Sequence, residues 1–147
     1  MITLHVPESI IAWLSFPPGI ENSVETSFEI YELHYSLGLV KETRELVRVI
    51  VAFPTFLSLS DQGADILTED LKKAFGDKPI IAFYFLGSQF HATSLIRVDE
   101  FSPEFEEFIK ECVRLAPLME QIGKTNSWNG ELIRLAREPL DEQKMQH

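Results

Sequence analysis

The alternation of apolar and polar residues is clearest in the middle of the chain. Ile80 to Leu86 is a short apolar run rich in aromatic and β-branched residues, and Pro79 and Gly87 bound it. This composition favours a buried strand over a helix. Gly87-Ser88 then forms a two-residue turn with glycine first, which is typical of a β-hairpin.

The turn sets the register of this hairpin, because residues opposite each other share a face of the sheet. The predicted pairs are Phe85 with Phe90, Phe83 with Ala92 and Ile81 with Ser94 on an apolar face, and Tyr84 with His91, Ala82 with Thr93 and Ile80 with Leu95 on a mixed face. We expect helices to pack on the apolar face.

A second pair of strands is predicted upstream. Residues 16–25 read as a loop, and alternation follows from Thr26 to Leu39, with a bulge or a strand start where its phase changes at Ile30-Tyr31. A helix over Glu25 to Leu39 is the alternative. Leu46 to Phe53 is β-branched enough to be the partner strand, which Pro54 closes.

Helical spacing of apolar residues marks four further segments. They are a short helix after Pro7 with Ile10, Ile11 and Leu14 buried, a helix within Ser58 to Gly76 with Ile66 on its buried stripe, a helix from Ser102 as N-cap that Pro117 kinks or ends, and a last helix over Glu131 to Glu138. The order is α-β-β-α-β-β-α-α. We therefore predict one α+β domain over residues 1–147, with an antiparallel sheet of about four strands covered on one face by helices and a frayed tail over 141–147.

Charge narrows the class of partner. The chain of 147 residues has 23 acidic and 13 basic residues and a formal net charge of −10. Nucleic acid and anionic membranes are repelled by such a chain, whereas a basic protein is attracted. The single cysteine excludes an internal disulfide and suits the cytoplasm. No apolar run reaches the roughly 20 residues that a membrane helix needs.

Few residues suggest catalysis. The chain has no phosphate-binding glycine loop, dinucleotide fingerprint or nucleophile elbow. The predicted mixed face gathers Glu32, His34, Ser36, Arg48, His91, Thr93, Arg97 and Asp99. Of these, His34, His91, Glu32 and Arg97 form an acid/base hypothesis, but a solvated sheet face explains the same residues. We predict no metal and no cofactor.

Two features instead predict protein contacts. Glu104, Glu107 and Glu111 form an acidic row on the outer face of their helix, suited to a basic partner. Ile80, Tyr84, Leu95, Leu46 and Ile50 leave apolar area on the uncovered side of the sheet, and such area usually marks an interface. Either a second copy of the chain or the N-terminal segment would cover it.

The sequence thus favours a non-catalytic protein-binding module, such as an adaptor, inhibitor or antidote-like protein, that forms a homodimer. A small enzyme or ligand-binding domain that uses the His34/His91 face is the alternative. A structural subunit of a larger assembly is a third reading.

Overall fold

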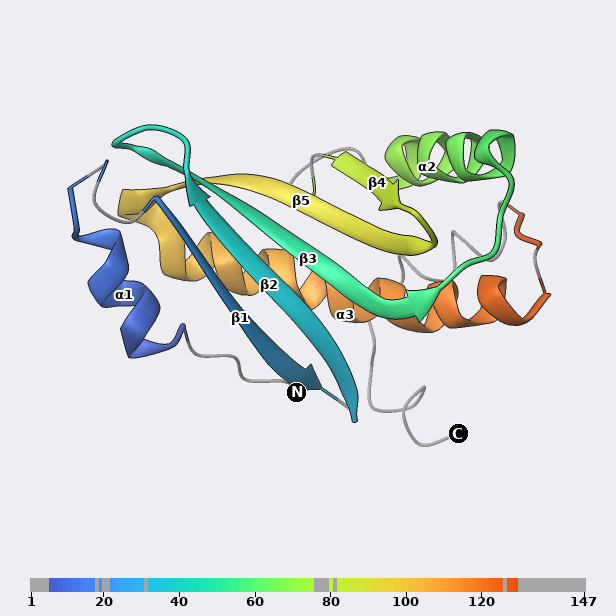
Figure 1. Cartoon of the computed structure of the whole chain (residues 1–147), viewed down its shortest axis with the longest axis horizontal. Helices are drawn as coiled ribbons and strands as arrows, with labels where there is room; N and C mark the ends of the chain where they lie inside the picture. The colour runs from blue at the N-terminus through green and yellow to red at the C-terminus, as the bar shows by residue number, and fades with distance from the viewer. Residues whose placement is uncertain are drawn as a thin grey trace.

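The computed structural model describes residues 6–17, 19, 22–30, 32–75, 80, 82–125 and 127–129. Within them, a five-stranded antiparallel sheet carries helices on one side (Figure 1). The elements in chain order are α1 (Glu8–Leu14), β1 (Ser23–Ile30), β2 (Leu33–Lys41), β3 (Leu46–Phe56), α2 (Asp61–Phe75), β4 (Ala82–Leu86), β5 (Gln89–Arg97), the 3₁₀ turn η1 (Val98–Glu100) and α3 (Phe101–Thr125). The predicted α+β class is confirmed, with the strands in the spatial order β1-β2-β3-β5-β4. The predicted helix over 131–138 and the tail over 141–147 lie outside the described residues.

The extra strand is β1, which takes in residues 23–25 of the predicted loop and the first five residues, 26–30, of the predicted strand. It pairs with β2 along its whole length, from Ser23 opposite Val40 to Ile30 opposite Leu33. The change of phase near Ile30 is a tight turn, in which Glu32 adopts a left-handed φ of 65°. The bulge and the alternative helix over 25–39 are therefore both wrong, because the alternation belongs to two strands of a hairpin.

The register predicted for the β4–β5 hairpin is confirmed from Ala82 to Leu86, and the predicted pair of Ile81 with Ser94 lies outside the described residues. Phe85 lies opposite Phe90 and Tyr84 opposite His91. Gly87 has a φ of 60°, the left-handed conformation that the first turn position of this hairpin type requires. Ile80 does not extend the strand onto the uncovered side. It is fully buried in the core, which corrects its predicted place.

The side chains on the helix-covered face of the sheet form much of the core. They are alternate residues of β2, β3 and β5, namely Tyr35, Leu37, Leu39, Val47, Val49, Val51, Phe53, Phe90, Ala92 and Ile96. Helix α3 packs against β3 and β5, and α2 packs against β4. In Figure 1, α3 runs behind the sheet for most of the sheet's length.

The helices begin and end differently from the predictions. α3 starts at Phe101, so Ser102 lies inside the helix, and it continues past the exposed Pro117 to Thr125. α2 starts at Asp61, where the Ser60 hydroxyl accepts the N–H of Gly63 at 3.0 Å. Ile66 is 47% exposed, so it is not part of the buried stripe that Leu67, Leu71 and Phe75 form.

Proline also fails to end β3. The strand continues past Pro54 to Phe56, and its register with β5 shifts between Ala52 and Phe56. Because Pro lacks the N–H that a regular ladder needs, an irregular stretch of this kind is where a strand tolerates it. The shift carries Phe56 to a position opposite Gln89.

Helix α1 packs on the same side as α3. Its Ile10 and Trp13 are buried in the core, whereas Ile11 is 45% exposed. The Lys41 ammonium, at the end of β2, donates to the carbonyl oxygens of Trp13 at 2.6 Å and Phe16 at 2.7 Å, and it lies 4.7 Å from the centre of the Trp13 ring. The N-terminal helix therefore does not cover the other face of the sheet.

Candidate functional site

The second face of the sheet carries no helix from the described part of the chain, and we call it the open face. The register places on it the alternate residues that do not join the core. They are Ser23, Glu25, Ser27 and Glu29 of β1, His34, Ser36, Gly38 and Val40 of β2, Leu46, Arg48, Ile50, Ala52 and Phe56 of β3, Ala82, Tyr84 and Leu86 of β4, and Gln89, His91, Thr93, Leu95 and Arg97 of β5.

One end of the open face is apolar. Phe56 is 65% exposed and Leu86 is 64% exposed, the highest exposures among the large hydrophobic residues that the structure describes. Both lie opposite Gln89, one from each neighbouring strand, so they flank it on the same face. Tyr84 lies in the next row, opposite His91. We call Phe56, Tyr84 and Leu86 the apolar end.

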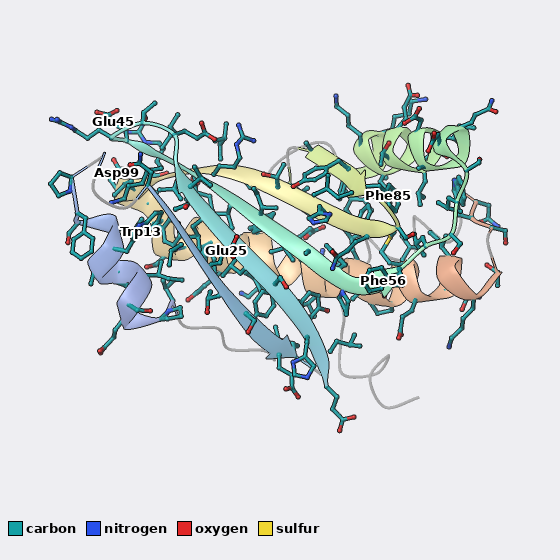
Figure 2. All side chains as sticks on the ribbon, in the orientation of Figure 1. Trp13, Glu25, Glu45, Phe56, Phe85 and Asp99 are labelled. Atoms are coloured by element: carbon teal, nitrogen blue, oxygen red, sulfur yellow. The ribbon has the colours of Figure 1, made fainter. Side chains whose placement is uncertain are left out.

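The other end of the open face carries charges that are paired within the chain. The Arg48 guanidinium donates to a Glu42 carboxylate oxygen at 2.7 Å, and Arg97 donates to Asp99 at 3.2 Å. The hydrogen bond with Arg97 lowers the pKa of Asp99 below its usual value. Figure 2 shows Asp99 at the opposite end of the sheet from Phe56.

The polar groups between these ends have partners within the sheet. The Thr93 hydroxyl donates to the Val49 carbonyl oxygen at 2.9 Å. The His91 ring stacks on Tyr84 with ring centres 4.9 Å apart, and its Nδ1 lies 3.0 Å from the Gln89 carbonyl oxygen. Burial lowers the pKa of His91 below its usual value. Burial in the sheet therefore favours the neutral form of this histidine.

The residues of the acid/base hypothesis are not brought together. Ser36, Ala52 and His91 form one row across three strands, so Ser36 and His91 lie about 10 Å apart, and His34 lies two residues further along β2. Arg97 is six residues from His91, about 20 Å along β5. Glu32 lies in the β1–β2 turn.

His34 has a partner of its own. Its side chain is 76% exposed, and its Nε2 lies 3.4 Å from a Glu29 carboxylate oxygen. Over the ranges that the structure describes, no group of three or more His, Cys, Asp or Glu side chains could hold a metal ion. Cys112 is buried, and burial raises its pKa well above the usual value, as expected of a core thiol.

The predicted partner-binding residues lie on two surfaces. Tyr84 and Leu95 are half-buried on the open face. The acidic row lies on α3, where Glu107 is 3.8 Å from the Lys110 ammonium and Glu111 is 3.2 Å from the Arg114 guanidinium. Basic residues one turn along the helix therefore offset much of the charge of this row.

Phe56 and Leu86 were not among the sequence-predicted site residues. Leu86 shares the phase of Tyr84 and directly precedes the turn, so the alternation already placed it on the open face. Phe56 has the same phase as Ala52, but it was missed because the predicted strand ended at Phe53, before Pro54.

Two surface hollows lie beside the end of α1, away from the open face. One of about 330 Å³ lies between α1 and the start of α3 and is lined by Ile11, Leu14, Ser15, Val98, Asp99, Phe101, Ser102 and Pro103. It contains no convergent set of nucleophile and base.

Comparisons with protein-family models, curated proteins and solved structures found no match to this chain. None of the helices in the described ranges is both long and apolar enough to cross a membrane.

Proposed function

We propose that this protein is a non-catalytic binding module that acts through protein contacts and self-associates through the open face of its sheet. The single observation that carries the proposal is the apolar end, where Phe56 and Leu86 are each about two-thirds exposed beside Tyr84. Clustered exposed apolar side chains are typical of an interface rather than of a free surface.

The polar content of the open face supports the same proposal. Thr93, His91 and Arg48 already have hydrogen-bond partners within the chain. Polar groups that are satisfied internally lose little when a partner displaces the water around them, because they keep their hydrogen bonds. The face spans roughly 19 Å across the strands and 27 Å along β5, about 500 Å² per copy, which is at the lower limit for a specific protein interface.

A second copy of the chain is the occupant to which we commit. A two-fold axis near the apolar end sets Phe56 of one copy against Leu86 of the other. The paired charges around Arg48 and Arg97 then form the rim, as interfaces commonly have. Because the centre is apolar, the association is expected to depend little on salt.

The further partner and the location in the cell are inferred from the amino-acid composition. The net charge of −10 favours a basic protein as the further partner, and the single, buried cysteine fits a reducing, cytoplasmic location.

The test is the solution mass of three proteins by analytical ultracentrifugation. We expect the wild type to be a dimer and the double variant Phe56→Ser, Leu86→Ser to be a folded monomer that unfolds cooperatively, with a midpoint lowered only by the stabilisation that dimerisation gives the wild type. The matched control is Ile11→Ser, Ile66→Ser, which removes two exposed hydrophobic residues from α1 and α2, away from the open face. The control is expected to remain a dimer.

A wild type that stays monomeric at high concentration contradicts self-association. A control that dissociates as much as the open-face variant would show that the open face is not the interface.

A further inference from the structure

Strand β1 forms one edge of the sheet and is a second surface built for protein contacts. It is eight residues long and pairs with β2 on one side, and its other side has no neighbouring strand within the described residues. An edge of this length offers a row of backbone donors and acceptors to another extended chain. Figure 1 shows β1 as the outermost strand of the sheet.

The register identifies the backbone groups that point outward. The Lys41 N–H donates to the Asn22 carbonyl oxygen at 2.8 Å, which makes this pair a hydrogen-bonded one. In an antiparallel ladder, bonded and non-bonded pairs alternate, so the even-numbered residues of β1 bond to β2. The backbone groups of Ser23, Glu25, Ser27 and Glu29 therefore point away from β2.

The acidic and the apolar side chains of β1 lie on opposite faces of the sheet. Glu25 and Glu29 are exposed on the open face, and Glu32 follows in the turn. Val24 and Phe28 are half-buried on the covered side, where the Phe28 ring stacks on Tyr35 with centres 4.8 Å apart. Glu29 also lies near His34, but both side chains are more than half exposed, so this contact competes weakly with a basic residue of a partner.

We propose that β1 accepts an extended basic segment of a partner protein as an antiparallel sixth strand. The segment has basic residues opposite Glu29 and Glu25, four positions apart, which places both on the open face. The two residues opposite Phe28 and Thr26 face the covered side and are apolar, and the one between them, opposite Ser27, is small. The segment thus has a basic-apolar-small-apolar-basic pattern.

The charge of the edge selects against a second copy of this chain. Antiparallel pairing of two β1 strands gathers four glutamates on one face, and some registers place Glu25 directly opposite Glu29 or another Glu25. Like charges opposite each other destabilise a strand pair. The inference rests on the proposed function only in assuming that the protein acts through protein contacts, since it uses a different surface from the apolar end.

The test uses an 11-residue fluorescent peptide with the central sequence Lys-Val-Ser-Val-Lys, and its binding is measured by fluorescence anisotropy. We expect saturable binding to the wild type that weakens with added salt. The control peptide with Glu in place of both Lys is expected not to bind. Equal binding of the two peptides, or no binding of the lysine peptide, overturns the proposal.

Ser27→Pro is the decisive variant. The Ser27 N–H points outward, so proline removes a donor to the added strand while the bonds between β1 and β2 remain. We expect at least tenfold weaker binding, with the unfolding midpoint measured as a check of the fold. Binding at wild-type strength by a folded Ser27→Pro protein overturns the proposal.

Two further variants test the contribution of charge to peptide binding and distinguish the edge site from the proposed dimer. Glu25→Gln, Glu29→Gln is expected to weaken binding roughly tenfold at low salt, because two exposed ion pairs are lost. Unchanged binding would contradict the proposed register. The variant Phe56→Ser, Leu86→Ser is expected to bind the peptide like the wild type, so failure of the dimer and failure of the edge site give different results.

Discussion

The two faces of the sheet are built from the same strands but are completed differently. On the covered face, the rings of Phe53 and Phe90 lie 4.9 Å apart and those of Phe83 and Phe90 lie 5.6 Å apart, and α2 and α3 close the cluster. On the open face, Tyr84 stacks on His91, and Phe56 and Leu86 remain exposed. Both faces contain apolar residues, but the helices pack on the face whose alternate positions are almost all apolar, as the alternation predicted.

The difference also explains where polar residues are found. Thr93 and His91 are nearly buried on the open face, and each bonds to a backbone carbonyl oxygen of the sheet. The covered face has no need of such bonds where its side chains are hydrocarbon. An open face with satisfied polar groups and exposed apolar ones is suited to reversible burial by a partner.

The largest expected effect is the loss of a ring from the covered face. Phe90→Ala is expected to lower the free energy of unfolding by about 3–5 kcal/mol, because Phe90 is fully buried and contacts three other rings. Leu86→Ala is expected to change it by less than about 0.5 kcal/mol. Urea unfolding of both variants is the measurement, and similar losses would show that the two faces do not differ as described.

The second-largest expected effect is the loss of the hydrogen bonds from Lys41 of β2 to the end of α1. Lys41→Met is expected to cost about 1.5–3 kcal/mol, because the ammonium donates to two carbonyl oxygens at the end of α1. Hydrogen exchange of the α1 amides should accelerate more than that of the α3 amides. Uniform acceleration in both helices would contradict a local role for Lys41.

A smaller effect is the pH dependence contributed by the open face. Because burial holds the pKa of His91 below its usual 6.5, the unfolded chain binds a proton here more readily than the folded one. The stability from neutral His91 is fully present above about pH 6.5 and decreases as the pH falls from there through the folded pKa. His91→Gln should flatten this decrease in thermal unfolding measured from pH 7.5 to 5, and an unchanged slope would remove His91 as its source.

The smallest expected effect belongs to the acidic row of α3. Glu104→Lys, Glu107→Lys, Glu111→Lys is expected to slow association with the lysine peptide less than threefold, because two of these carboxylates already pair within the helix. Stopped-flow rates at low salt, compared with those of Glu25→Gln, Glu29→Gln, provide the test. A larger drop in the helix variant would place the partner on α3 instead of on β1.

Local sequence was sufficient to predict the β4–β5 hairpin and the two faces of β3. Gly87 determined the turn, and the turn determined that Tyr84 faces His91 and Phe85 faces Phe90. The period of two in Leu46 to Phe53 determined which of its residues share a face. The sequence also separated apolar from polar positions well enough to predict the α+β class.

Tertiary structure decided what such patterns leave open. The β1–β2 turn depends on a left-handed φ at Glu32, a position where the sequence has no glycine to indicate a turn. The register shift beyond Pro54 sets Phe56 opposite Gln89 and therefore beside Leu86. Ile80 and Ile66 have the same side chain, yet Ile80 is fully buried and Ile66 is 47% exposed. Periodicity specifies the neighbours of a residue within its own element, whereas burial depends on which distant element packs against it, and that is a property of the whole fold.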